Sequence, residues 1–304
     1  MFDPLRLYRV YHRLWRIGMP VVPPALYRLN RVLTGCDLPP SAAVGRGVVF
    51  QHWGTGIAVS PNTVIEDDVV LLPQARLLVP AGHEDAVRIH VGRGAQIGAG
   101  AVVFAESSLH IGDGAQIGAG SLVQSSVGAG ATVFGCRDIE FRLQCLPAAG
   151  SNRPPLVDPR RIHALARWLY VRRIRWLPGL LYRANYVANR CIIGANIEVG
   201  KGVRIGRWVQ ISFTNIGESV RLDHGVIVAR NVRRGRASQT DFIEIERGAE
   251  IGAGAVIVGA DGMRIGEHSR IDKGAVVTKS VPPGFTAYGA PARVVPPARL
   301  AEPQ

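Results

Sequence analysis

A strict six-residue repeat constrains the fold of this chain more than any other feature of its sequence. Between residues 89 and 123 aliphatic residues recur at steps of six in two runs, Val91, Ile97, Val103 and Ile111, Ile117, Val123. Neither the helical period near 3.6 nor the strand period of two explains a step of six. Short strands joined by tight turns do explain it, because stacked coils bury such residues in a column. The repeat therefore predicts a parallel β-helix.

The same step extends over most of the chain. Its further runs are Val59, Ile65, Leu71, Leu77; Val199, Ile205, Ile211; Ile216, Leu222, Val228; Ile245, Ile251, Ile257; and Ile265, Ile271, Val277. The hydrophobic fraction of 47% and the 36 glycines suit a solenoid with glycine-rich corners rather than a disordered chain.

This pattern resembles the hexapeptide-repeat acyltransferases over residues 37–133 and 193–295. The resemblance implies an all-β fold whose coils are left-handed, and a homo-oligomer that is usually a trimer. The handedness and the trimer come from the resemblance and not from the spacing.

The two repeat regions align on each other as a tandem duplication. At a constant offset Tyr27 matches Tyr182, Cys36 matches Cys191, and Gly45 matches Gly200. Helical stretches, residues 1–35 and about 159–190, precede the two regions, and a proline-containing loop separates the copies. We expect two domains, residues 1–150 and 151–304, each a short basic helical cap followed by a β-helix.

The net charge of +13 is concentrated in the two helical stretches. Their arginines, interleaved with Trp, Tyr and Leu, are Arg6, Arg9, Arg13, Arg16, Arg28, Arg31, Arg160, Arg161, Arg167, Arg172, Arg173, Arg175, Arg183 and Arg190. The helices either cap the solenoid ends only, or also contact an anionic membrane surface. We expect no nucleic-acid partner, because no nucleic-acid-binding fingerprint accompanies the charge.

Cysteine usage and the opening residues bear on the compartment. The four cysteines form no CxxC pair and are typical of free thiols in a reducing compartment. Arginines interrupt residues 1–18, so we expect no signal peptide, and no charge-free apolar run approaches the length of about 20 residues that spans a membrane. We expect a cytoplasmic protein, with a peripheral position at the inner membrane face as the alternative.

His52 is the main catalytic candidate. Its surroundings, Phe50-Gln-His-Trp-Gly-Thr-Gly-Ile-Ala-Val59, resemble the segment around the catalytic histidine of serine acetyltransferases and exopolysaccharide O-acetyltransferases. An imidazole can take the proton of an attacking hydroxyl at neutral pH, and backbone N–H groups of a glycine-rich segment can hold an oxyanion. The second copy has Arg207 at this position, which cannot act as a base. The alternative is an ordinary exposed turn residue.

Gln51 stands where serine acetyltransferases have an aspartate before this histidine. This difference argues against serine as the acceptor and favours a sugar hydroxyl. The carboxylate that would orient His52 has no clear position, and Glu66 and Asp67 are the candidates that we consider.

Two further histidines are weaker catalytic candidates. His83 lies in a segment that interrupts the repeats, and serine acetyltransferases have a second histidine in a comparable loop; a solvated loop is the alternative. His224 follows Asp223 in the second copy, two residues after an aliphatic repeat position, and a turn residue is again the alternative. His90 and the Glu84-Asp85 pair lack metal-ligand spacing, so we predict no metal.

The resemblance also implies where acetyl-CoA, the expected cosubstrate, would bind. Pantetheine would lie along the small corners formed by Ala99, Gly100, Ala119 and Gly120. The C-terminal segment around Lys279 and Gly289-Ala-Pro-Ala292-Arg293 resembles the family's terminal coil, where cations suit the phosphate end of the cofactor. The alternative is a tail that only closes the solenoid.

The first copy has His52 without this tail and the second has the tail without His52, so the copies either divide the labour or only one is catalytic.

These observations predict a coenzyme-A-dependent O-acyltransferase, most simply an acetyltransferase, that modifies a hydroxyl of a saccharide or polysaccharide precursor. The alternative enzyme acetylates serine or an amino sugar. The alternative from another class is a non-catalytic β-helix scaffold in a polysaccharide assembly complex.

Overall fold

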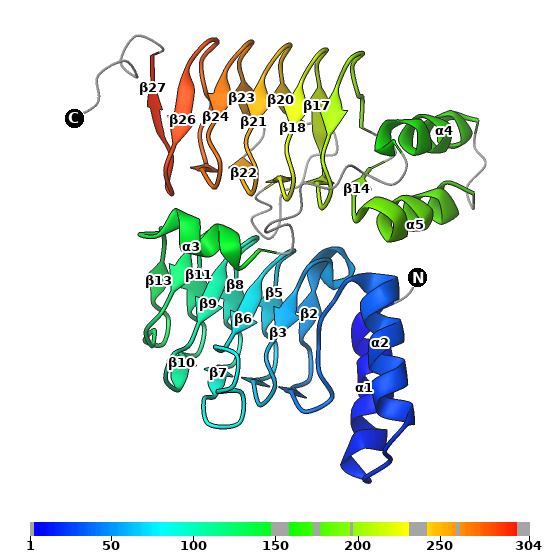
Figure 1. Ribbon diagram of the computed structural model, residues 1–304. Helices are drawn as coiled ribbons and strands as arrows, with labels where there is room; N and C mark the ends of the chain where they lie inside the picture. The colour runs from blue at the N-terminus through cyan, green and yellow to red at the C-terminus, as the bar shows by residue number, and fades with distance from the viewer. Residues whose placement is uncertain are drawn as a thin grey trace. The chain divides into compact units, whose positions relative to one another are not determined.

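The structure, a computed structural model, describes residues 3–146, 158–172, 177–194, 197–230, 242–259 and 262–296. These residues form two compact units that divide between Asp138 and Ile139. Each unit contains a pair of helices at one end of a stack of short strands (Figure 1). The boundary expected at residue 150 lies outside the described residues, so that exact division stays a prediction.

The first unit begins with a helix pair, α1 (Pro4–Arg16) and α2 (Val22–Thr34). Its strands are β1 (Ala43–Val44), β2 (Val49–Phe50), β3 (Ala58–Val59), β4 (Val64–Ile65), β5 (Val70–Leu71), β6 (Arg76–Leu78), β7 (Ile89–Val91), β8 (Gln96–Ile97), β9 (Val102–Phe104), β10 (Leu109–Ile111), β11 (Gln116–Ile117), β12 (Leu122–Val123) and β13 (Thr132–Val133). They stack in three parallel sheets, in the orders β1-β4-β7-β10, β2-β5-β8-β11-β13 and β3-β6-β9-β12.

The strand register shows why the repeat has a period of six. Leu71 pairs with Ile97, and Ile97 pairs with Ile117, so residues one coil apart lie directly above one another. All three side chains are buried in the core of the unit. One strand and one turn together occupy about six residues. At the corners the residues either have small side chains or adopt a left-handed backbone conformation. The predicted parallel β-helix is confirmed.

The second unit repeats this arrangement. Its helices are α3 (Ile139–Gln144), α4 (Pro159–Val171) and α5 (Leu177–Asn189). Its strands are β14 (Ile192–Ile193), β15 (Arg204–Ile205), β16 (Gln210–Ile211), β17 (Thr214–Ile216), β18 (Arg221–Leu222), β19 (Ile227–Arg230), β20 (Ile243–Ile245), β21 (Glu250–Ile251), β22 (Val256–Gly259), β23 (Arg264–Ile265), β24 (Arg270–Ile271), β25 (Val276–Val277), β26 (Thr286–Tyr288) and β27 (Arg293–Val295). The sheet orders are β14-β16-β19-β22-β25, β15-β18-β21-β24-β26-β27 and β17-β20-β23. Only the β26–β27 pairing is antiparallel among the described strands.

The leading helices of the two units start in the same way. Asp3 precedes Pro4 at the start of α1, and its side chain accepts a hydrogen bond from the backbone N–H of Leu5. Asp158 caps α4 in the same manner through the N–H of Arg160. An aspartate cap followed by proline is a strong start signal for a helix. Within the described part of the chain, no helix is both long enough and apolar enough to cross a membrane.

All four cysteines are free thiols, as the sequence predicts. Cys36 and Cys191 are buried at equivalent places in the two units. Burial raises the pKa of the Cys191 thiol to about 12.

Candidate active site

His52 lies on an enlarged corner of the first β-helix. The corner between β2 and β3 spans residues 51–57, whereas the equivalent corner between β15 and β16 of the second unit spans residues 206–209. The first unit therefore has three additional residues at this place. The enlarged corner contains a tight turn, Gln51–Gly54, that interrupts the regular coil, and His52 and Trp53 within it are not in right-handed helical conformation.

The backbone of this corner is unusual. His52, Trp53, Gly54 and Gly56 all have positive φ, at 47°, 60°, 68° and 69°. Single left-handed residues occur at other corners, but His52 and Trp53 are the only adjacent non-glycine pair of this kind among the described residues. Each such residue costs on the order of 1–2 kcal/mol. Strain concentrated at one exposed corner is a reason to suspect function there.

Thr55 and Gly54 hold the corner in place. The Thr55 hydroxyl donates a hydrogen bond of 2.7 Å to the carbonyl of His52, and the Thr55 side chain is buried. A Cβ on Gly54 would lie 3.3 Å from the sulfur of Cys36 and 3.2 Å from the Phe50 ring, so a larger residue would crowd the core. The Gly-Thr-Gly segment therefore fixes the backbone that presents His52.

The imidazole of His52 is set up to be neutral at physiological pH. The side chain is exposed, yet the protein atoms around it displace enough water to lower its pKa below the ordinary value. Its ring makes no ion pair or hydrogen bond with any other described residue. A neutral, unpaired imidazole at a protein surface can accept a proton from a bound hydroxyl.

The two carboxylates considered as partners of His52 are engaged elsewhere. Glu66 pairs with His90, with 3.0 Å between Glu66 Oε1 and His90 Nε2. Asp67 accepts a hydrogen bond of 2.7 Å from the backbone N–H of Arg46. Neither one orients His52.

Glu66 begins a short polar chain that was not predicted from the sequence. His90 Nδ1 lies 2.8 Å from His110 Nδ1, and the two rings stack at 4.8 Å. The two histidines are twenty residues apart, which is the length of one coil here, and β7 and β10 place them side by side. The spacing of twenty residues between His90 and His110 could have predicted this cluster from the sequence. Nevertheless, among the described residues no three His, Cys, Asp or Glu side chains are arranged to hold a metal ion.

His83 lies in an exposed turn between β6 and β7, and its side chain makes no hydrogen bond or ion pair with the other candidates. Its backbone N–H donates to the Pro80 carbonyl, and its own carbonyl accepts from the N–H groups of Ala86 and Val87. These bonds close the turn, and a catalytic role for His83 stays a prediction.

His224 has a geometry that is poorly suited to a general base. The backbone N–H of Arg207 donates to its Nδ1 over 3.0 Å. Nδ1 therefore carries no proton, and in the neutral ring Nε2 is protonated and has no lone pair to offer. The preceding Asp223 does not orient it, because that carboxylate pairs with Arg221 at 2.9 Å.

The small corners proposed for pantetheine stack as expected for a β-helix. The Gly100 and Gly120 backbones have φ of 62° and 63°, and the Gly120 N–H donates to the Ala99 carbonyl. Ala99, Gly100 and Gly120 are buried, whereas Ala119 is half-buried. A cofactor would thus reach this column first at Ala119.

The C-terminal segment closes the second β-helix. The Ala292 N–H donates to the Val276 carbonyl, and Arg293 pairs with Tyr288 in the β26–β27 hairpin. Lys279 and Arg293 are exposed on this last coil. They belong to the second unit and His52 to the first, and whether they serve one site stays a prediction.

Helix α3 covers the equivalent corner column of the second unit. A Cβ on Gly254 would lie 2.3 Å from Leu143 Cδ2, and one on Gly274 would lie 2.4 Å from Ile139 Cγ2. The fully buried Arg142 donates a hydrogen bond of 2.7 Å to the Gly254 carbonyl. Only glycines leave room for the helix to approach this closely.

Comparisons with known proteins give partial matches. No family model matches the chain. The serine acetyltransferase of Salmonella typhimurium is 36% identical over 122 residues, which cover 34% of this chain and 44% of that protein. The serine acetyltransferase of Buchnera aphidicola is 35% identical over 169 residues, covering 53% and 61%.

The chain spans about half the length of the curated relatives that it matches. Among solved structures, soybean serine acetyltransferase complexed with serine is 28% identical with a TM-score of 0.41, covering 45% of this chain and 56% of that one. The repeat, the stacked sheets and the sequence relatives agree. The chain is similar in sequence to serine acetyltransferases, and its stacked parallel sheets form a β-helix of the hexapeptide-repeat kind.

Proposed function

We propose that the protein is an acetyl-CoA-dependent O-acetyltransferase with His52 as its general base. The observation that carries the proposal is the neutral, unpaired imidazole on a strained corner of a fold shared with serine acetyltransferases. His52 takes the proton of the acceptor hydroxyl as the hydroxyl oxygen attacks the thioester carbonyl. The carbon–sulfur bond then breaks, and the coenzyme A thiolate leaves and is protonated.

Serine is the first acceptor to consider, because the curated relatives are serine acetyltransferases. A saccharide hydroxyl is the second, and two features of the corner favour it. Gln51 provides no carboxylate beside His52, and the half-buried Trp53 offers an aromatic face next to the base. Aromatic rings combine a large apolar surface with few rotatable bonds, which suits them to packing against a sugar ring.

Cofactor binding would use the small corners of the first unit. Pantetheine would enter beside Ala119 and follow the column toward Gly100. Lys279, Ala292 and Arg293, on the last coil of the second unit, stay proposed as residues that contact the phosphate end of the cofactor. A trimer would follow the pattern implied by the family resemblance, and light scattering of the full chain would measure it.

The α1–α2 turn gives specific support to the membrane contact. Ile17 and Val21 at this turn are 74% and 73% exposed, and Trp15 is 44% exposed. Arg13 and Arg16 lie in the last turn of α1 beside them. Exposed apolar side chains flanked by cations fit the interface of an anionic bilayer.

Thiol release from acetyl-CoA tests the proposed function. The full chain is assayed with L-serine, with an amino sugar and with neutral monosaccharides, and the acetylated product is identified by mass. We expect acceptor-dependent thiol release that is lost in His52→Ala. If no acceptor stimulates release and acetyl-CoA does not bind, the protein is a β-helix scaffold and the proposal is wrong.

A further inference from the structure

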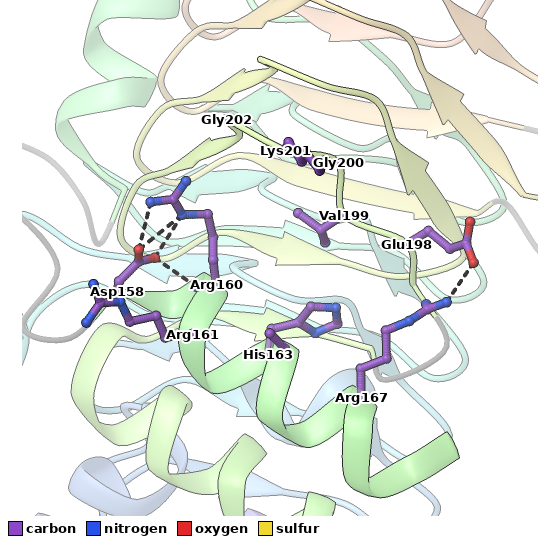
Figure 2. Close-up of a pocket in the computed structure, with 11 residues that line it drawn as sticks. Asp158, Arg160, Arg161, His163, Arg167, Glu198, Val199, Gly200, Lys201 and Gly202 are labelled. Atoms are coloured by element: carbon purple, nitrogen blue, oxygen red, sulfur yellow. Dashed lines mark hydrogen bonds and ion pairs between the residues drawn. The ribbon is translucent and has the colours of Figure 1, made fainter. Parts of the chain in front are cut away.

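A cleft of about 610 Å³ opens between α4 and the first corner of the second β-helix. Figure 2 shows Arg160, His163 and Arg167 on the face of α4 that is turned toward the segment Glu198–Gly202. In the sequence these arginines are visible only as members of a basic helical stretch. The volume of the cleft lies within the range of about 300–1,000 Å³ that is usual for small-ligand sites.

Cations outnumber anions in the lining of this cleft. Arg160 is paired with Asp158, with 2.7 Å between Nη2 and Oδ2, and this hydrogen bond lowers the pKa of the Asp158 carboxyl. Arg167 is paired with Glu198 at 2.6 Å. Arg161 and Lys201 remain, and neither side chain makes an ion pair or a side-chain hydrogen bond with another described residue. The lining therefore has two positive charges in excess, which attract an anion.

His163 lies between the two ion pairs and is only 4% exposed. Its Nε2 lies 3.2 Å from the Ile197 carbonyl, which can only accept, so Nε2 carries the proton. Its Nδ1 is then an acceptor, and it is buried without a hydrogen-bond partner among the residues that the structure describes. Burial of the ring lowers its pKa and keeps it neutral. An unsatisfied buried acceptor is costly, and a hydroxyl donor would relieve that cost.

At the equivalent place in the first unit, the buried side chain leaves no polar atom unpaired. At an offset of 155 residues, Tyr8 stands where the second unit has His163, and Leu5 where it has Arg160. The Tyr8 hydroxyl donates to the Ala42 carbonyl at 2.5 Å, just as His163 donates to the carbonyl of the equivalent Ile197. The single polar atom of Tyr8 is hydrogen-bonded, whereas His163 has a second ring nitrogen, Nδ1, that accepts no hydrogen bond from another described residue. The second unit therefore has polar side chains, His163 and Arg160, where the first unit has Tyr8 and Leu5.

We propose that this cleft binds a phosphorylated monosaccharide, with Arg161 and Lys201 on the phosphate and His163 Nδ1 accepting from a sugar hydroxyl. Free phosphate would leave most of the volume unfilled and would offer little to a neutral imidazole. A nucleotide fits less well, because the described residues of the cleft lining include no aromatic ring besides His163 on which a base could stack. Nδ1 is buried, so the proposed contact requires Arg160 or Arg167, which flank His163 on α4, to move aside when the ligand binds (Figure 2).

Titration calorimetry of the full chain with glucose 1-phosphate tests this proposal. We expect saturable binding, at least tenfold tighter than that of inorganic phosphate. The double variant Arg161→Gln/Lys201→Gln should weaken binding at least tenfold. His163→Tyr, which installs the residue of the first unit, should abolish the preference for glucose 1-phosphate over inorganic phosphate.

The first unit provides a matched control for charge. Arg6 and Arg46 occupy the positions equivalent to Arg161 and Lys201, and Arg6→Gln/Arg46→Gln should bind glucose 1-phosphate as the wild type does. Equal loss in this control, or equal binding of inorganic phosphate, overturns the proposal. Binding should persist in His52→Ala, so the proposed acetyl transfer can fail while this proposal holds.

Discussion

Replacing His52 with glycine should change activity and stability in opposite directions. The imidazole is the proposed general base, and loss of a general base costs about 10²–10⁴-fold in rate. At about 1.36 kcal/mol for each factor of ten, that is about 3–5 kcal/mol of transition-state stabilisation. The same residue holds a left-handed backbone with φ of 47°, and glycine adopts this conformation without strain.

The expected gain in stability follows from two opposing contributions. Relief of a left-handed side chain contributes about 1–2 kcal/mol, and the greater freedom of glycine in the unfolded chain removes about 0.4–1 kcal/mol of it. The net gain is roughly 0–1.6 kcal/mol, with a central value of about 0.8 kcal/mol. His52→Ala loses the imidazole but keeps the strain, so it should be as inactive as His52→Gly and measurably less stable.

Steady-state thiol release and thermal unfolding of the full chain measure the two effects. His268→Gly is the matched control, because His268 is an exposed histidine with φ of 52° on a corner of the second unit. It should show the same stabilisation with unchanged activity. Turnover above half of the wild-type value in His52→Ala would remove His52 from the mechanism. Equal stability of the glycine and alanine variants would refute the strain argument.

Four further predictions follow from other parts of the structure. The pKa of His52 is lowered, so the base stays unprotonated at pH 7 and kcat/KM should fall only as the pH drops below 6.5; a limb above 6.5 in the pH profile would contradict this. Residues 1–138 and 139–304 each contain their own core, and when expressed separately residues 139–304 should show no acetyl transfer; activity in that half would move the catalytic assignment to His224. Ile17→Ser/Val21→Ser should reduce sedimentation with phosphatidylglycerol vesicles at low salt, whereas binding that is equal on neutral vesicles would leave the helices as caps. Arg142→Ala removes a charged hydrogen bond inside the α3 contact and should lower the free energy of unfolding by about 1.5–3 kcal/mol; an unchanged denaturation midpoint would show that α3 does not stabilise the unit.

The sequence predicts the β-helix well because one side chain in six carries the structural information. Ile97, for example, is buried between Leu71 and Ile117 in the stack, so its position in the repeat determines both its neighbours and its burial. Local spacing is sufficient for such a fold, since each coil contacts mainly its neighbours.

The candidate site is less predictable because its geometry depends on details that the repeat does not encode. His52 could be identified from its motif, but the two consecutive left-handed residues at its corner are visible only in the structure. Glu66 is close to His52 in sequence, yet the coil period brings it to His90 instead. His163 could have been found by comparing it with Tyr8, which is the residue at the same offset in the first copy.

The position of α3 has a consequence for competition between ligands. Gly254 and Gly274, on which Leu143 and Ile139 pack, match Gly100 and Gly120 of the first unit at a constant offset. The second unit therefore already holds a segment of its own chain over the column that we propose for pantetheine in the first. A tethered segment can act at an effective concentration that reaches the millimolar range. A free cofactor present at micromolar concentration would be outcompeted there, and coenzyme A would be directed to the first unit without any sequence change in the corner glycines of the second.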